Sequence, residues 1–139
     1  MPTLPFTPAW ADALRAVIDT DPTYRDAGRR WKWPVALVLD ATPQYGYPEA
    51  VAVQLALADG GCHGAEVLPA DDVTAEFVLR GDYPTWKLVA TGALDAVSAV
   101  MAGRLSLTGS MMTLMQQASA AQALVACARQ VKTRYPDEG

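Results

Sequence analysis

Gly103-Arg-Leu-Ser-Leu-Thr-Gly109 opens the stretch of sequence that decides the fold, and Ser110-Met-Met-Thr-Leu-Met-Gln-Gln117 continues it toward Val131. In the opening segment, leucines alternate with polar residues, which is the period of a half-buried strand. Gly109 permits a sharp turn. After it, apolar residues recur every three or four positions, as on one side of an amphipathic helix. The stretch therefore predicts a strand over 104–109 and a C-terminal helix over 110–134.

Methionine is concentrated in the first turns of this predicted helix. Met111, Met112, Leu114 and Met115 place four long apolar side chains in five positions, and small residues follow on the same stripe. Methionine is flexible and polarizable, so it suits a wall that adapts to different apolar shapes. The alternative is that these residues are ordinary core. Both interpretations remain open, and the first indicates an apolar cavity beneath the helix.

Length, composition and charge restrict the class of protein. The chain has 139 residues, of which 51% are hydrophobic and 19% charged, as expected for a single globular domain over 1–139. The net charge of -4 and the lack of a Lys/Arg cluster argue against a nucleic-acid partner. The sequence contains neither an apolar run of membrane-spanning length nor a signal-peptide pattern. We therefore expect a cytoplasmic protein without stable membrane insertion.

The two cysteines carry no clear chemical signal. Cys62 and Cys127 could form a disulfide only if the fold brought them close, and two free thiols are the simpler expectation. Cys62 is followed by His63, but this pair lacks the further ligands that a zinc or iron site requires. The sequence therefore predicts no metal site and no cofactor.

The rest of the chain divides into three blocks that set the fold class. Residues 1–32 have the pattern of helices, and 33–81 contain four strand patterns, with a hairpin signal at Asp59-Gly60-Gly61. Residues 82–103 contain two short helices before the strand over 104–109. Strands joined by hairpins, beside segregated helices, predict an α+β domain. We expect a five-stranded, mostly antiparallel sheet covered on one face by about five helices, with the order of its strands left open.

Several motifs in the second half of the chain resemble those of a known family. They are Phe77-Val-Leu-Arg-Gly-Asp82, Trp86 with Leu88, Gly92-Ala-Leu-Asp95, and Ala99-Val-Met-Ala-Gly103-Arg-Leu-Ser-Leu-Thr-Gly109. In these residues the chain resembles the sterol carrier protein 2 (SCP2-like) sterol-binding domain, and the order of elements agrees over 35–131. The resemblance implies a sheet roofed by helices around an apolar tunnel that holds sterols, fatty acids or fatty acyl-CoA. Arg104 stands where the family has Lys, and Ser110 where an acidic residue is usual.

This resemblance and the apolar patterning together predict non-enzymatic binding or transfer of a hydrophobic ligand in an internal cavity. The candidate wall consists of inward-facing apolar residues, some of which serve only as core: Phe77, Leu79, Trp86, Val97, Met101, Leu105, Leu107, Met111, Met112, Leu114 and Met115. Each methylene removed from water contributes about 0.8 kcal/mol. A charged residue at Met112 or Met115 is therefore expected to weaken uptake.

Two other functions fit some features of the sequence. The bulky Trp and Met residues could fill the cavity themselves, which would leave an accessory domain whose apolar patch forms a homodimer. An enzyme could instead use His63 with Asp40 or Glu66, since histidine titrates near neutral pH. The sequence shows neither a nucleophile motif nor a Gly-rich phosphate loop, which favours binding over catalysis.

Overall fold

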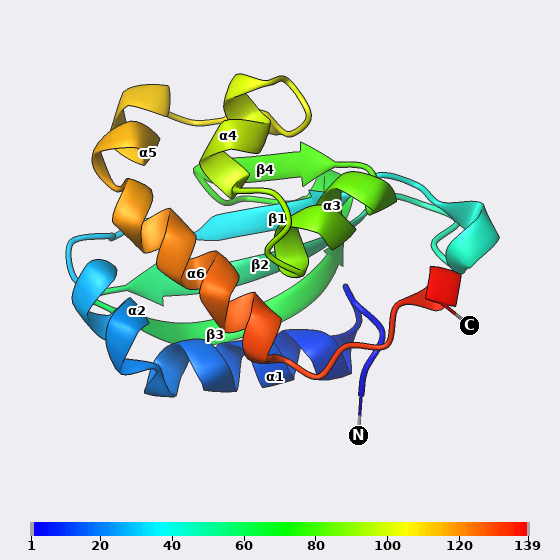
Figure 1. Ribbon diagram of the computed structural model, residues 1–139, viewed down its shortest axis with the longest axis horizontal. Helices are drawn as coiled ribbons and strands as arrows, with labels where there is room; N and C mark the ends of the chain where they lie inside the picture. The colour runs from blue at the N-terminus through cyan, green and yellow to red at the C-terminus, as the bar shows by residue number, and fades with distance from the viewer. Residues whose placement is uncertain (1, 139) are drawn as a thin grey trace.

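The computed structural model describes residues 2–138, in which a five-stranded sheet has helices on one face (Figure 1). The strands are β1 Val35–Leu39, β2 Val51–Ala58, β3 Gly61–Pro69, β4 Phe77–Gly81 and β5 Ser106–Thr108. Their order in the sheet is β3-β2-β1-β4-β5. Strands β1 and β4 pair in parallel, and the other three pairings are antiparallel. The predicted α+β fold with a mostly antiparallel sheet is confirmed.

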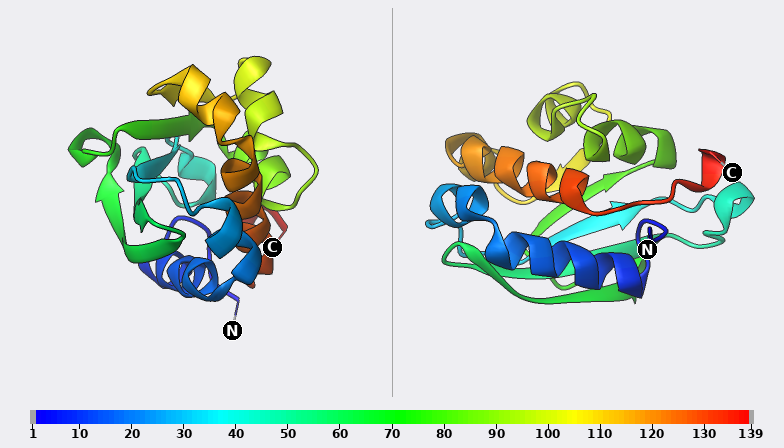
Figure 2. Two further views of the ribbon diagram at one scale, coloured as in Figure 1. Left: turned by 90° about the vertical axis from the view of Figure 1, so that its left-hand side faces the viewer. Right: turned by 60° about the horizontal axis from the view of Figure 1, so that its bottom comes forward.

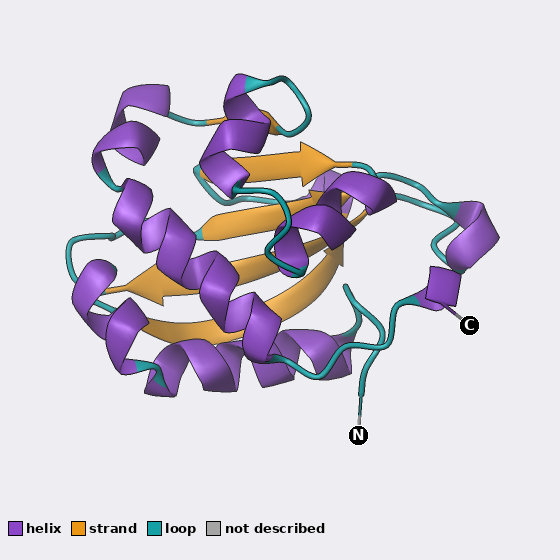
Figure 3. Cartoon of the chain, in the orientation of Figure 1, coloured by secondary structure: helices purple, strands orange, loops and turns teal. Residues whose placement is uncertain are grey.

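Six α-helices accompany the sheet within residues 2–138 (Figure 3). They are α1 Pro8–Thr20, α2 Pro22–Ala27, α3 Tyr83–Ala90, α4 Ala96–Met101, α5 Met111–Gln116 and α6 Ala118–Gln130. Short polar side chains cap five of them by accepting a hydrogen bond from a backbone N–H in the first turn: Thr7, Asp21, Asp82, Asp95 and Ser110. These caps explain why each of the five helices begins where it does.

The parallel pairing of β1 with β4 requires the chain to cross behind the sheet. The connection over 70–76 makes this crossing, from the β3 edge to the far side of β1 (Figures 1 and 3). Gln54 of β2 holds it, because its side-chain oxygen accepts hydrogen bonds from the backbone N–H groups of Thr74 and Ala75 at 2.9 and 3.1 Å. The hairpin signals in the sequence do not reveal this crossing, since β3 and β4 are consecutive along the chain but are not neighbours in the sheet.

The turn between β2 and β3 is the hairpin that the sequence predicts. Asp59 and Gly60 both have positive φ angles, of 53° and 83°, as a two-residue turn that matches strand twist requires. Ala58 and Gly61 pair directly across it. The prediction of a tight reversal at Asp59-Gly60 is therefore confirmed.

The main core lies between the sheet and the helices. Figure 2 shows α1, α2 and α6 on the same side of the sheet, and alternate strand residues point toward them. This core includes Trp10, Leu14 and Ile18 of α1, Val35, Leu37 and Leu39 of β1, and Val53, Leu55 and Leu57 of β2. In β1 and β2, every second residue therefore faces this core.

The C-terminal helix predicted over 110–134 is wrong as a single element. It divides at Gln117, whose φ of -110° and ψ of 30° lie outside the helical range, and α6 ends at Gln130. Helix α5 follows β5 at the edge of the sheet, whereas α6 crosses the sheet face (Figure 3). The two directions differ, so the chain must bend between them. The N-terminal helical block also ends earlier than its pattern predicts, because α2 stops at Ala27.

We predict that Gly109→Ala destabilises the protein by about 1–3 kcal/mol, measured by urea unfolding. Gly109 has a φ of 123°, and an added Cβ would lie 2.8 Å from Phe77 Cδ1 and 3.1 Å from the Glu76 carbonyl oxygen. Gly64→Ala is the matched control, since its Cβ would meet only Ala56 Cβ, at 4.0 Å. The control should change stability by less than about 0.5 kcal/mol; equal effects of the two changes would contradict the argument.

Candidate functional site: apolar cavities beneath α6

Two narrow cavities lie between α6 and the sheet, with volumes of about 60 and about 30 Å³. The larger, here called the first cavity, is lined by Pro5, Phe6, Trp10, Leu14, Leu37, Leu79, Tyr83, Trp86, Lys87, Val89, Ala90, Ala96, Ala121, Leu124, Val125, Ala128 and Tyr135. The second cavity is lined by Tyr24, Trp31, Val35, Leu57, Phe77, Leu79, Leu107, Leu114, Ala120, Ala121 and Leu124. Both contain space for more than a water molecule.

The two cavities are neighbours. Three residues line both of them: Leu79 of β4, and Ala121 and Leu124 of α6. Side chains of β4 and α6 therefore separate the two cavities. Leucine side chains change rotamer far more easily than a helix moves. The two cavities therefore lie next to each other beneath α6, the first on the side of α3 and the second on the side of α2 and α5.

Small residues on α6 leave this space open. Ala121 and Ala128 face the first cavity together with the partly buried Leu124 and Val125. They recur at spacings of three and four, so they lie on one side of the helix. An alanine methyl group does not reach across the gap between a helix and a sheet, and the space beneath it stays empty.

Aromatic rings close the opposite wall of the first cavity. Phe6 stacks on Trp10 with ring centroids 5.5 Å apart and lies 5.7 Å from Trp86. The indole N–H groups point away from the cavity: Trp86 donates to the Val38 carbonyl oxygen at 2.8 Å, and Trp10 donates to Thr133 Oγ1 at 3.0 Å. The wall of the first cavity therefore exposes only apolar atoms, so the site is suited to hydrocarbon.

The backbone of Phe6 is strained to reach this position. Its φ is 60°, in the left-handed region that bulky residues rarely adopt. Tyr47 fixes the preceding residue by donating its hydroxyl hydrogen bond to the Pro5 carbonyl oxygen at 2.5 Å. The surrounding packing thus holds Phe6 against the cavity despite the backbone cost.

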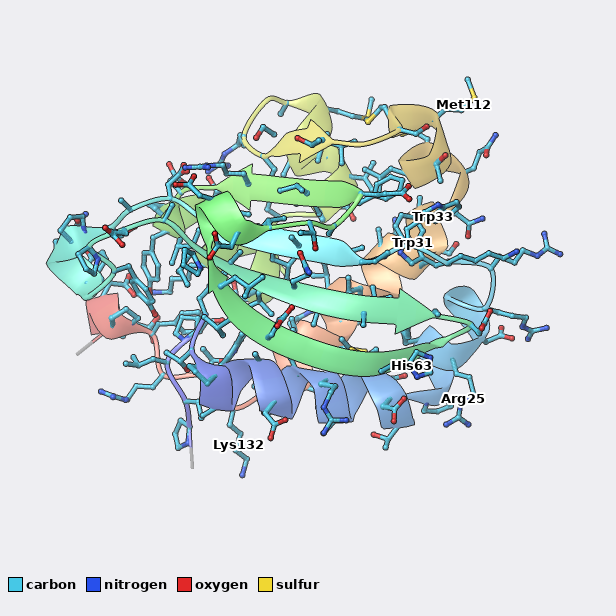
Figure 4. All side chains as sticks on the ribbon, turned by 180° about the vertical axis from the view of Figure 1, so that it is seen from behind. Arg25, Trp31, Trp33, His63, Met112 and Lys132 are labelled. Carbon is cyan, nitrogen blue, oxygen red and sulfur yellow. The ribbon has the colours of Figure 1, made fainter. Side chains whose placement is uncertain are left out.

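A second aromatic cluster borders the second cavity. Trp31 lies 4.8 Å from Phe77 and 5.1 Å from Trp33 between ring centroids, and both Trp31 and Trp33 are labelled in Figure 4. The Trp31 indole N–H donates to the Trp33 carbonyl oxygen at 2.7 Å. Trp31 and Phe77 therefore line the second cavity with rings, and the polar group of Trp31 is already used.

The rim of the first cavity carries its one charged lining residue, Lys87. The ammonium group is bound by the C-terminal tail, at 2.9 Å from Asp137 Oδ2 and 2.5 Å from Glu138 Oε2. Tyr83 donates its hydroxyl hydrogen bond to Asp137 Oδ1 at 2.6 Å. Tyr135 also lines the cavity, and its ring centroid lies 5.4 Å from Lys87 Nζ. The tail therefore covers this rim with one aromatic ring and two carboxylates.

These contacts keep the rim groups charged over a wide pH range. The hydrogen bond from Tyr83, followed by that from Lys87, lowers the pKa of Asp137 below its ordinary value of 3.8. Glu138, followed by Asp137, raises the pKa of Lys87 above 10.5. The stability that the Asp137 carboxylate contributes to the folded protein is present above pH 3.8 and is lost as the pH falls through its lowered pKa. The stability that the Lys87 ammonium contributes is present below pH 10.5 and is lost as the pH rises through its raised pKa. Both persist at neutral pH.

The structure places five of the eleven predicted wall residues at a cavity. Leu79 and Trp86 line the first cavity, while Phe77, Leu79, Leu107 and Leu114 line the second. Val97 and Leu105 are buried but line neither. The four methionines point outward, with exposures of 66% for Met101, 36% for Met111, 71% for Met112 and 47% for Met115. Figure 4 shows Met112 projecting away from the sheet.

The helical period explains the exposed methionines of α5. At about 100° per residue, Met112 and Met115 lie on other sides of the helix than Leu114, and Met111, which lies nearer to Leu114, is the least exposed of the three. Leu114 turns inward, with an exposure of 5%. The methionines of α5 occupy its other sides.

Several wall residues are absent from the predicted set. Trp10 and Leu14 belong to an apolar stripe on α1, and Ala121, Val125 and Ala128 to one on α6, so a helical-period signal for them exists in the sequence. Phe6 and Tyr135 have no such signal. They reach the cavity from the two ends of the chain, where long-range packing alone positions them.

His63 and Asp40, suggested together for catalysis, do not assemble into one site. His63 is exposed near the start of β3, whereas Asp40 follows the end of β1 and binds Arg80 at 2.6 Å. The register pairs Leu39 with Val51, and Val51 with Pro69, so Asp40 and His63 lie near opposite ends of the sheet. Figure 4 shows His63 on β3.

Within residues 2–138, the side chains and helices meet the requirements of neither a metal site nor a membrane-spanning helix. No group of three or more His, Cys, Asp or Glu side chains in this range is placed to hold a metal ion. None of the helices described there combines the length and the hydropathy needed to cross a membrane.

Comparisons with known proteins agree with the fold. The SCP-2 sterol transfer family matches residues 14–122. A crystal structure of sterol carrier protein 2 is 39% identical, with a TM-score of 0.87 over 91% of this chain and 98% of that one. A conserved hypothetical protein from Thermus thermophilus, described as possibly a sterol carrier protein, is 38% identical, with a TM-score of 0.86 over 93% and 90%. Sterol carrier protein 2 from Yarrowia lipolytica shares the fold at 16% identity, with a TM-score of 0.56 over 86% and 88%. No curated protein sequence matches the chain.

We predict that neither cysteine reacts quickly with Ellman's reagent at about pH 8 in the folded protein. Cys62 and Cys127 are free and buried, and burial raises the pKa of both thiols, that of Cys127 to about 12. The reactive thiolate is therefore scarce in both. In guanidinium chloride both thiols should react fully and fast. Rapid labelling without denaturant would contradict this burial.

Proposed function

Because this chain belongs to the SCP-2 sterol transfer family, we propose that it binds or transfers a hydrophobic ligand, held in the two cavities beneath α6. The observation that carries the proposal is the wholly apolar wall of the first cavity, in which the indole groups of Trp10 and Trp86 donate their hydrogen bonds elsewhere. A dry apolar space inside a domain favours hydrocarbon over polar solutes. The names of the similar structures, sterol carrier proteins, support the same class of ligand.

The shape of the cavities favours a flexible alkyl chain, as in a fatty acid or fatty acyl group. Two narrow voids separated by Leu79 and Leu124 can admit a chain that bends between them, whereas a rigid ring system requires larger displacements of α6. Each buried methylene contributes about 0.8 kcal/mol, which is offset in part by the cost of ordering ligand and side chains. Binding of this kind requires no catalytic group, and we propose that the function is non-enzymatic.

We predict that Ala121→Phe reduces uptake of a long-chain lipid by at least about tenfold, because a ring at this position fills space shared by both cavities. Uptake is measured by displacement of a fluorescent fatty acid and by native mass spectrometry. Ala121→Leu, a smaller addition, should give an intermediate loss, and circular dichroism reports whether each variant folds.

Met112→Glu is the matched control for this experiment. Met112 is 71% exposed and lines neither cavity, so a folded protein with unchanged uptake is expected, in contrast to the expectation from sequence alone. If the wild-type protein shows only its apo mass, yields no lipid in an organic extract and displaces no probe, the proposed function is wrong.

The exposed methionines favour a second candidate function, an interface. Met101, Met111, Met112 and Met115 place large apolar side chains at the surface of α4 and α5. Methionine-rich surfaces adapt to varied partners, and a homodimer is the simplest such assembly. Light scattering measures this directly: a dimer that Met112→Glu dissociates supports the interface, and a monomer at every concentration excludes the homodimer.

A further inference from the structure

The polar end of a ligand has few places to bind. This inference rests on the proposed function, that an alkyl chain fills the first cavity. The wall of that cavity exposes only apolar atoms, and Lys87 is its only charged residue. A buried polar head without a hydrogen-bond partner is strongly disfavoured. An amphiphilic ligand whose chain enters the first cavity from this side therefore places its head at the rim, beside Lys87.

The protein already places a carboxylate at this position. Asp137 accepts a hydrogen bond from the Tyr83 hydroxyl at 2.6 Å through Oδ1, and its Oδ2 lies 2.9 Å from Lys87 Nζ. One carboxylate thus bridges a phenol and an ammonium group. Glu138 adds a second carboxylate to the same ammonium, at 2.5 Å. The geometry shows that this rim accommodates a carboxylate group at hydrogen-bond distance from two donors.

The tail that supplies these carboxylates is attached in two different ways. Its first residues are fixed by backbone hydrogen bonds, from the Thr3 N–H to the Lys132 carbonyl oxygen at 3.0 Å and from the Arg134 N–H to the Thr3 carbonyl oxygen at 2.8 Å. Within residues 2–138, the side-chain hydrogen bonds and ion pairs that join 136–138 to the rest of the fold come from Asp137 and Glu138, and they end on Tyr83 and Lys87. The last turn can therefore leave the rim while residues 132–134 stay in place.

We propose that Lys87 and Tyr83 form a binding site for the carboxylate head of a long-chain amphiphile, and that Asp137 and Glu138 occupy this site in the free protein. A ligand carboxylate replaces that of Asp137, and Tyr135 moves aside as the chain enters the first cavity. The tail is thus an internal competitor of the ligand.

The charge of the head decides which ligands can replace the tail. When Asp137 and Glu138 leave, Lys87 loses two anionic partners at a position where its side chain is only 23% exposed. A carboxylate restores both the ion pair with Lys87 and the hydrogen bond from Tyr83. An alcohol or an ester is uncharged and cannot restore the ion pair. The lowered pKa of Asp137 and the raised pKa of Lys87 keep the tail bound at neutral pH, so competition rather than titration releases it.

The experiment compares dodecanoate with 1-dodecanol, which have the same chain length, on the full chain by isothermal titration calorimetry at neutral pH. Lys87→Met should lower the affinity for dodecanoate about tenfold and should change the affinity for dodecanol by less than about twofold. The double variant Asp137→Asn/Glu138→Gln should tighten the binding of dodecanoate about three- to tenfold, because the competing charges are gone. Dodecanol also has to displace Tyr135, so its binding should tighten as well, but by no more than that of dodecanoate.

Two control variants make the same changes of charge elsewhere. Lys132→Met removes an exposed lysine, and Asp71→Asn/Asp72→Asn removes two exposed carboxylates on the turn before β4; neither should alter the affinity for dodecanoate. If dodecanol binds but Lys87→Met weakens neither ligand, the lipid cavity stands and the carboxylate site is wrong. If the tail variant weakens dodecanoate, the tail contributes to the site and is not a competitor. If the wild-type protein binds neither ligand, the proposed function fails and this inference with it.

Discussion

Helix α6 must bury one side across the sheet, and the rest of the structure depends on this packing. Ala123 and Cys127 are buried on that helix, and Cys127 is 0% exposed. Small residues at neighbouring positions bring α6 against the fold without filling the space beneath it. Protein interiors are normally close-packed, and an unfilled void of about 60 Å³ costs on the order of 1–2 kcal/mol. A ligand that fills the space recovers this cost.

The wall of the first cavity stays apolar because its aromatic residues use their polar atoms elsewhere. Trp86 donates to the backbone of β1, and Trp10 donates to Thr133 in the C-terminal tail, so no polar group is left to hold water in the cavity. Both ends of the chain meet at this wall, with Phe6 on the N-terminal side and Tyr135 on the C-terminal side. Segments near chain ends usually open at lower cost than strands in a sheet, so access to the cavity can change while the sheet stays intact.

The sequence by itself determined the elements whose signals are local. The strand alternation, the Asp59-Gly60 turn and the stripe of Ala121, Val125 and Ala128 are short-range patterns, and each has its counterpart in the structure. The motifs around Phe77 and Gly103 were enough to indicate the family that residues 14–122 match. These features follow from steric preferences and from hydrophobic period, which a few neighbouring residues express completely.

Only the tertiary structure decided which apolar residues face the cavity. Leu114 of α5 faces inward and the three methionines of that helix point outward, because the side of a helix that is buried depends on what the helix packs against. The parallel pairing of β1 with β4 and the arrival of Phe6 and Tyr135 at one rim join residues that are far apart in sequence. The contact of Lys87 with Asp137 spans 50 residues, and no local pattern can specify a contact at that distance, since its free energy exists only once the chain has folded.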